Sequence, residues 1–359
     1  MTGKTDNLPL LQLKRAENMK EESIRDQILS GTRKGGKEYT FNAFEEDDPN
    51  KPAQWWFQES DEGLILFVVF YSQACRWARC LGCNLPSKMS VDHVSFDYII
   101  KQIDHLFSLP EIVERYDAIN KMIVSNNGSV LDEQTFSSTA LMYLMAQANI
   151  HLLSLKVLAL ESRPEYVDTA ELEFLARALH EGEIATDLEL CIGFEAFDEH
   201  IRNTVFDKGL SLNAFEDFVK KIAPYGYHLK CYFMLKPVPG MSDAEAVEDI
   251  QQAIDYLDTI STKYGITLNM HLNPTYAAYG TLLGKAFVQG EYLPPTLQDL
   301  ARAASHAQGK KISVFLGLSD EGLAEQGGSF IREGDEALLE RLEEFNRTQD
   351  YRILRELQS

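Results

Sequence analysis

The sequence contains no long hydrophobic run and carries little positive charge. No apolar stretch in its 359 residues approaches the roughly 20 residues that cross a bilayer. The first residues also lack the charged-then-apolar layout of a secretory signal. Lys and Arg number 34 against 55 Asp and Glu, a net charge of −21. We therefore expect no membrane partner and disfavour nucleic acid, because phosphate-binding surfaces are basic.

Cysteine is also scarce, and its distribution is uneven. Of five cysteines, Cys75, Cys80 and Cys83 fall within nine residues, whereas Cys191 and Cys231 stand alone in apolar stretches that favour core packing. This usage fits a reducing cytoplasm better than a disulfide framework. The trio follows the apolar run 64–71, which is typical of a buried strand. The thiols are thus expected at the C-terminal end of a strand, where α/β folds place their chemistry.

Strand and helix patterns alternate along the chain. Short apolar runs predict strands at 64–71, 120–126, 153–161, 187–194, 227–235 and 266–272. Helical patterns fall between them at 91–107, 133–148, 168–181, 211–223 and 242–263, with N-caps at Asp132, Asp168, Ser211 and Ser242. Six βα units imply one parallel sheet, either curled into a barrel or open and doubly wound.

Two flanking segments complete the expected organisation. Residues 1–60 are polar, with a helix expected over 16–30, and Trp55 and Trp56 are expected to dock this extension onto the body. Residues 61–300 hold the repeated units. Residues 301–359 contain a possible seventh strand at 311–316 and a terminal amphipathic helix over 334–357.

Three clustered thiols leave two kinds of metal site open. In the first, His93 completes a Cys3His zinc site with Cys75, Cys80 and Cys83. In the second, the three thiolates hold a [4Fe–4S] cluster and leave one iron open for another ligand. A chain of this size has a core large enough to be stable without a structural zinc ion, which favours the cluster.

The order of the later motifs resembles that of a known family. The cysteines are spaced Cys-x4-Cys-x2-Cys, and polar or glycine-containing segments follow at 125–132, 161–165, 191–196, 235–237 and 272–275. Over about residues 62–300 this series resembles the radical S-adenosylmethionine enzymes, in the branch of the archaeosine synthase radical subunit and the elongator catalytic subunit. The usual spacing of that superfamily is Cys-x3-Cys-x2-Cys with an aromatic residue before the last cysteine, where this chain has Gly82.

The resemblance implies a fold, cofactors and roles for particular residues. The fold is a partial (β/α)6 TIM-type barrel with parallel strands, and the cofactors are a [4Fe–4S] cluster on the three cysteines and S-adenosylmethionine, cleaved to a 5′-deoxyadenosyl radical. The residues implied in cofactor or substrate binding are Gly128, Ser129, Glu161, Arg163, Glu195, Lys236 and Asn273. His271 and Tyr276 are candidate proton or hydrogen-atom donors, with barrel packing as their alternative.

Partners and substrate follow from the same resemblance and from charge. We expect a reductant such as flavodoxin or ferredoxin, and a small molecule, nucleoside or peptide as substrate. RNA is the second choice and requires a basic partner subunit. A zinc-stabilised protein without redox chemistry and a non-catalytic redox sensor remain as alternatives.

Overall fold

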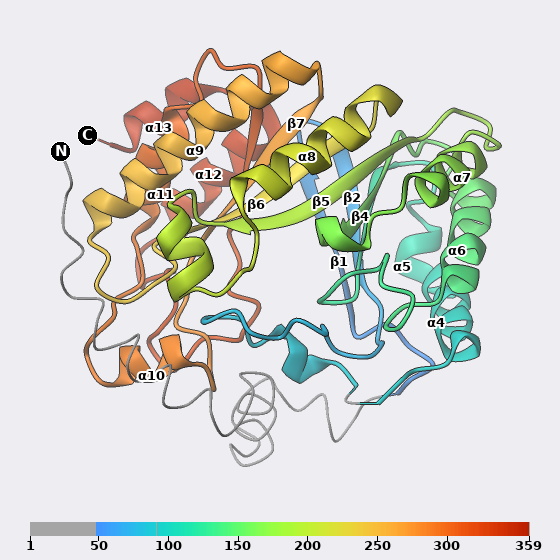
Figure 1. Cartoon of the computed structure of the whole chain (residues 1–359), viewed down its shortest axis with the longest axis horizontal. Coiled ribbons are helices and arrows are strands. Elements are labelled where there is room, and N and C mark those ends of the chain that lie inside the picture. Colours follow the sequence, from blue (N-terminus) through green and yellow to red (C-terminus); the bar gives the residue numbers. More distant parts are fainter. Residues whose placement is uncertain (1–47, 91, 359) are drawn as a thin grey trace.

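The computed structural model describes residues 48–90 and 92–358, which are built around one eight-stranded sheet (Figure 1). The strands are β1 (Gln54–Ser60), β2 (Gly63–Val69), β3 (Ile119–Ser125), β4 (Val157–Ser162), β5 (Asp187–Glu195), β6 (His228–Leu235), β7 (Leu268–Pro274) and β8 (Ser313–Leu316). Their order in the sheet follows the chain from β1 to β8. β1 pairs antiparallel with β2, and every later pair is parallel.

Most of the helices lie on the outer face of the curled sheet, whereas α10 (Leu282–Val288) lies at one edge of it (Figure 1). The helices are α4 (Phe96–Ser108), α5 (Pro110–Val113), α6 (Ser138–His151), α7 (Thr169–Leu179), α8 (Leu212–Ile222), α9 (Asp243–Tyr264), α10, α11 (Leu297–Ser305), α12 (Glu336–Thr348) and α13 (Tyr351–Glu356). In the described part of the chain, no helix has both the length and the apolar content for a membrane span. The predicted curled parallel sheet is confirmed.

Alternation along β2 divides the core between two faces. Leu66 and Val68 join the large cluster that packs under the helices. Ile65, Phe67 and Val69 join a small cluster on the other face. Successive strand residues point to opposite faces, so a continuous apolar run such as 64–71 belongs to a strand buried on both sides. The second face is the barrel interior.

The expected strands are confirmed, with one shifted start. The predicted seventh strand is β8, and β4 begins at Val157 rather than at residue 153. Helix α6 continues to His151, and Leu153 in the following connection is 42% exposed. The apolar residues before Val157 therefore serve the turn between α6 and β4.

Three of the four predicted N-caps are confirmed. The side chains of Asp168, Ser211 and Ser242 accept hydrogen bonds from the first turns of α7, α8 and α9. The prediction for Asp132 is wrong, because α6 is capped by Ser137. The Asp132 carboxylate instead forms an ion pair with Arg76.

The single terminal helix predicted over 334–357 is wrong, because the chain breaks into α12 and α13. Gln349 ends α12 with a left-handed φ of 52°. Its side-chain amide bonds both the N–H and the carbonyl of Val314 in β8. This tertiary contact explains the break.

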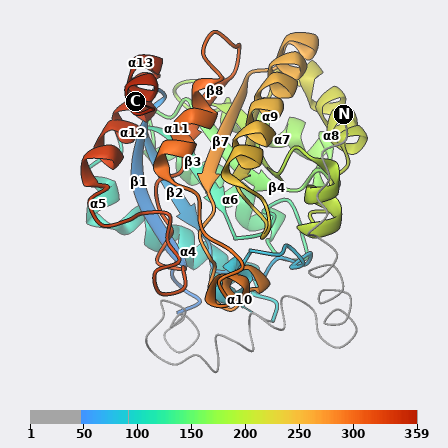
Figure 2. The ribbon, with the colours of Figure 1, turned by 90° about the vertical axis from the view of Figure 1, so that its left-hand side faces the viewer.

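Helix α12 covers the open side of the sheet. β1 and β8 are its two edges, and α12 contacts both of them (Figure 2). The Asn346 amide bonds the N–H and carbonyl of Leu316 in β8, and its backbone carbonyl accepts from the N–H of Asp61 beside β1. A helix thus fills the gap between the edge strands.

The tryptophan pair lies inside the sheet's first strand. Trp55 and Trp56 belong to β1, and Trp56 stacks on Phe67 with ring centroids 4.2 Å apart. β1 thus precedes the expected boundary at residue 61 and still pairs with β2 along its length. The helix expected over 16–30 lies outside the described residues.

Candidate active site

A cavity of about 1030 Å³ lies on the inner face of the sheet. Every strand from β1 to β8, or the loop that follows it, contributes lining residues. The carboxyl ends of parallel strands meet at one edge of a sheet, which is why residues distant in sequence converge here. The segment that carries the three cysteines lies at this edge, together with α10 (Figures 1 and 2).

Cys75, Cys80 and Cys83 are free thiols, half-buried, and all three line the cavity. Burial raises the pKa of Cys80 to about 12 and raises that of Cys83 as well, and the neighbouring thiols add to both shifts. Lys208 and Arg163 act in the opposite direction on Cys80. The thiols are therefore close enough to influence one another and lie beside positive charge that favours thiolates.

Glycines allow the cysteine loop to pack tightly. A Cβ on Gly128 would lie 3.1 Å from the Cα of Cys75, so the turn after β3 touches the backbone of the loop. A Cβ on Gly82 would lie 3.0 Å from Leu283 of α10. An aromatic residue at position 82 would collide with that helix, and the aromatic of the loop is Trp77, which also lines the cavity.

The three thiols line the cavity together, without His93. Three thiolates are the donor set that would hold a [4Fe–4S] cluster with one iron left open. His93 is exposed, lies against the carbonyl of Gln134 and does not line the cavity. The Cys3His arrangement is not formed.

A pair of opposite charges lies beside the cysteines. Lys208 Nζ is 2.8 Å from Glu195 Oε1, and both side chains are mostly buried. Burial alone would lower the pKa of Lys208, but the Glu195 carboxylate raises it overall. Arg163 lies over the Trp77 ring at 4.4 Å and donates to the carbonyl of Lys208. This part of the cavity can bind a molecule that carries both an anionic group and hydroxyl donors.

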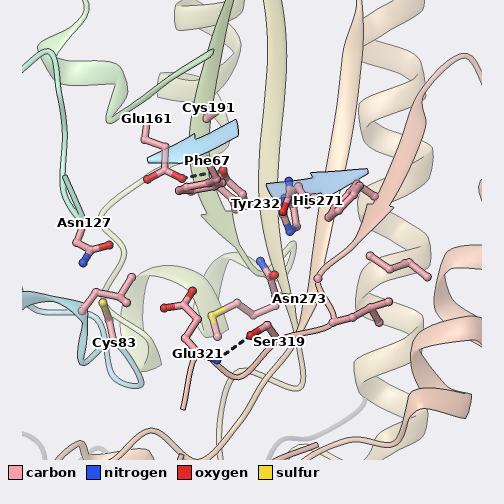
Figure 3. A pocket seen from close by; sticks show the side chains of 18 of the residues that line it. Phe67, Cys83, Asn127, Glu161, Cys191, Tyr232, His271, Asn273, Ser319 and Glu321 are labelled. Carbon is pink, nitrogen blue, oxygen red and sulfur yellow. Dashed lines mark hydrogen bonds between the residues drawn. The ribbon is translucent and has the colours of Figure 1, made fainter. Parts of the chain in front are cut away.

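Glu161 is the centre of a second polar group, further along the inner face (Figure 3). Tyr232 donates its hydroxyl to Glu161 Oε1 at 2.7 Å, and Ser125 donates to Oε2. Burial raises the pKa of Glu161, and these two hydrogen bonds partly oppose that rise. Burial and the Glu161 carboxylate hold the pKa of Tyr232 well above its usual value.

His271 lies between two aromatic rings. Its imidazole is 4.8 Å from the Tyr232 ring and 4.8 Å from the Phe315 ring. Burial lowers the pKa of His271 well below its usual value, so the ring is neutral at pH 7. Among the described residues its Nδ1 has no hydrogen-bond partner. Burial also raises the pKa of Tyr276, which keeps that phenol protonated.

The structure brings all but two of the predicted site residues to the cavity. Ser129 is buried behind it, within 2.7 Å of the hydroxyl of Ser162. Lys236 follows β6, and its ammonium binds Asp243 at the start of α9 at 2.6 Å. These two side chains are occupied by neighbouring elements and do not line the cavity.

Several residues that line the cavity were not predicted as site residues from the sequence. Trp56, Phe67 and Tyr232 lie on predicted or observed strands, where inner and outer positions cannot be told apart from a continuous apolar run. Lys208, whose side chain is 11% exposed, also lines the cavity. Arg202, on the segment before it, is fully buried and donates to backbone carbonyls.

Backbone strain also gathers at the cavity. Asn127, Glu195 and Glu321 line it and have positive φ values of 54°, 76° and 55°. Residues other than glycine adopt this conformation at a cost of about 1–3 kcal/mol, and such residues cluster at functional sites. The three follow β3, end β5 and follow β8.

Comparison with known proteins gives two relatives by sequence. No protein-family model matches the chain. It is 27% identical over 269 residues to archaeosine synthase subunit beta of Methanosarcina acetivorans, which covers 72% of each chain. It is 23% identical over 321 residues to an uncharacterised protein of Methanocaldococcus jannaschii, covering 86% of this chain and 84% of that one. The resemblance predicted from the ordered motifs is confirmed.

One solved structure with a similar arrangement is SuiB of Streptococcus suis bound to S-adenosylmethionine. It matches with a TM-score of 0.47 and 11% identity, over 70% of this chain and half the length of SuiB. A likeness of this size indicates neither a shared activity nor a shared ligand.

Proposed function

We propose that the protein is a radical S-adenosylmethionine enzyme. The observation that carries the proposal is the convergence of Cys75, Cys80 and Cys83 on one cavity at the carboxyl ends of a curled parallel sheet. The resemblance to archaeosine synthase subunit beta supports it. When bound, a reduced [4Fe–4S] cluster supplies the electron that cleaves S-adenosylmethionine into methionine and a 5′-deoxyadenosyl radical.

The residues beside the cysteines are suited to hold S-adenosylmethionine. Arg163 is a buried guanidinium, which matches a planar carboxylate. Glu195 can accept hydrogen bonds from ribose hydroxyls, with Lys208 fixing its position. Gly128 lets the turn after β3 approach the backbone of Cys75 closely, which brings backbone groups of this turn beside the cysteines, where the methionine amino group would bind.

The rest of the cavity is suited to protect a reactive substrate. Trp56, Phe67 and Phe315 line it with aromatic surface that excludes water. Asn273 supplies an amide for substrate binding, and Tyr276 keeps its proton. His271 is neutral, so its role is to accept or donate a hydrogen bond rather than to carry charge.

We take the substrate to be a small molecule, a nucleoside or a peptide side chain, and the electron donor to be a flavodoxin or ferredoxin. The five free cysteines favour the reducing cytoplasm. A second candidate function is modification of a tRNA base together with a basic partner subunit. It is favoured by the resemblance to one subunit of archaeosine synthase and opposed by the net charge of −21.

The test is anaerobic loading of the full chain with iron and sulfide, followed by electron paramagnetic resonance with and without S-adenosylmethionine. We expect about four irons per chain, a cluster signal that changes on adding S-adenosylmethionine, and 5′-deoxyadenosine after reduction. Cys83→Ala should lose the cluster, whereas Cys231→Ala, at a core position away from the cavity, should retain it.

Two outcomes would contradict the proposal. Stoichiometric zinc that is lost in His93→Ala, with no iron chromophore, would establish the zinc-stabilised alternative. A stable cluster that never yields 5′-deoxyadenosine under strong reductant would establish the redox-sensor alternative.

A further inference from the structure

We propose that Glu321 is a substrate-recognition residue that binds a positively charged nitrogen group carried on a flat apolar body. The inference rests on the function proposed above and names the class of substrate that the same cavity takes. Glu321 belongs to the loop between β8 and α12 and lines the cavity.

The loop directs Glu321 into the cavity. In Figure 3 its side chain extends inward, with the carboxylate between Cys83 and Asn273 in that view. The Glu321 N–H donates to Ser319 Oγ at 3.0 Å, which fixes the turn. The residue keeps a φ of 55°, where glycine or asparagine would be less strained. The chain therefore holds a charged side chain at a position where the backbone disfavours one.

The Glu321 carboxylate differs from those of Glu161 and Glu195, which also line the cavity. Glu161 accepts from Tyr232, and Glu195 is paired with Lys208. Within residues 48–90 and 92–358, no side chain or backbone group bonds the Glu321 carboxylate or forms an ion pair with it. The Glu321 side chain is half-buried, so its carboxylate has lost part of its hydration without gaining a partner and is suited to one that arrives from solution.

In the part of the chain that the structure describes, Lys88, Arg163 and Lys208 each have another partner. Lys88 attracts Glu321 from a distance, and its ammonium contacts Gln54. Arg163 is paired with Glu165, and Lys208 with Glu195. Burial raises the pKa of Glu321, and a bound cation would reverse that effect.

The aromatic residues that line the cavity indicate which kind of molecule carries the positive group. Trp56 and Phe67 are stacked at 4.2 Å, and the Tyr232 and Phe315 rings flank His271. Aromatic faces attract cations and pack against flat apolar groups. The unpaired charge in this part of the cavity is negative, so an anionic group such as a phosphate is disfavoured here. A protonated amine or amidine on a planar ring satisfies both the carboxylate and the walls.

The experiment compares two probes of nearly equal shape. Benzamidinium carries the positive nitrogen group, and benzamide is its neutral counterpart. Binding to the full chain is measured by calorimetry for the native protein, for Glu321→Gln and for Glu333→Gln. The last variant removes one charge from an exposed position in the same connection between β8 and α12.

We expect Glu321→Gln to weaken benzamidinium binding at least tenfold and Glu333→Gln to leave it unchanged. Benzamide should bind the native protein and Glu321→Gln equally, which also establishes that the variant is folded. The inference is overturned if the native protein does not prefer benzamidinium to benzamide, or if Glu321→Gln binds benzamidinium as the native protein does.

A second measurement separates the substrate from S-adenosylmethionine, whose methionine part also carries an ammonium. In the iron-loaded protein, the S-adenosylmethionine concentration that half-changes the cluster signal should differ less than twofold between the native protein and Glu321→Gln. A tenfold increase would assign Glu321 to S-adenosylmethionine and overturn the inference. The probe experiment needs no cluster, so its failure leaves the proposed function standing, and failure of cluster loading leaves the probe result standing.

Discussion

At the scale of single residues, a buried cluster of charged side chains stabilises the barrel interior. Lys121 near the start of β3 is fully buried, and its ammonium lies 2.7 Å from Glu62 and 2.7 Å from Glu189. Burial alone would lower the pKa of Lys121, but the two carboxylates raise it. Burial would raise the pKa of Glu189, but Lys121 and Lys230 lower it overall. Each charge is retained inside because the others are present.

Replacing Glu189 with glutamine should destabilise the fold by about 3 kcal/mol, because it leaves buried Lys121 with one carboxylate. The pKa of Glu189 is depressed in the native state, so its contribution is complete above its ordinary pKa near 4.5 and is lost as the pH falls through the native value. The difference in unfolding free energy between native protein and variant should therefore shrink below about pH 4.5.

Urea unfolding over a series of pH values measures this difference. Glu183→Gln, at an exposed position, is the matched control and should change stability by less than about 0.5 kcal/mol. A difference that stays constant down to about pH 3 would contradict the assignment of the effect to Glu189 ionisation.

At the scale of elements, α12 protects the last edge of the sheet. The side-chain amides of Asn346 and Gln349 bond the N–H and carbonyl groups of Leu316 and Val314 at distances of 2.8–3.3 Å. These are the groups with which another strand would pair. The edge of β8 is thus blocked by two side chains of a helix instead of by a ninth strand.

The double variant Asn346→Ala/Gln349→Ala should lose about 2–4 kcal/mol of stability, since each lost hydrogen bond contributes about 1 kcal/mol or less in net terms and buried groups are left unpaired. It should also aggregate faster, because the edge becomes available. Denaturant unfolding and light scattering measure the two effects. Glu340→Ala on the exposed side of α12 should show neither, and equal scattering of both variants would refute the edge-blocking role.

The elements also show which parts of the fold can be predicted from sequence. β2 to β8 are apolar runs with turn signals, so their period and length identify them. β1 was not predicted, because its residues are mostly half-buried and follow a polar segment. The break at Gln349 was not predicted either, because it depends on a contact with β8 that local propensity does not contain.

At the scale of the whole molecule, some residues of the candidate site could be predicted from the sequence and others could not. The cysteines and the motif at the end of each strand could be predicted because polar residues directly follow apolar runs. Glu321 could not, because its place in the cavity depends on how the loop after β8 folds. Ser129 and Lys236 satisfy the same sequence pattern and are occupied by Ser162 and Asp243 instead.

The net charge of −21 is a property of the complete chain and sets its behaviour toward polyanions. We expect the chain alone to show no binding to tRNA at micromolar concentration and about 150 mM salt, because few counterions would be released. An electrophoretic mobility assay measures this. The control is the same assay after addition of a basic partner protein, and tight binding by the chain alone would contradict the expected preference for smaller substrates.

The three thiols come from one short segment, whereas the walls around them come from β1 to β8 and from loops as late as Glu321. During synthesis on a ribosome, the three thiols therefore emerge long before the walls formed by β3 to β8. Under the proposed function, loading of the cluster is then a step for the fully synthesised chain, because a nascent chain would leave its iron exposed to oxygen.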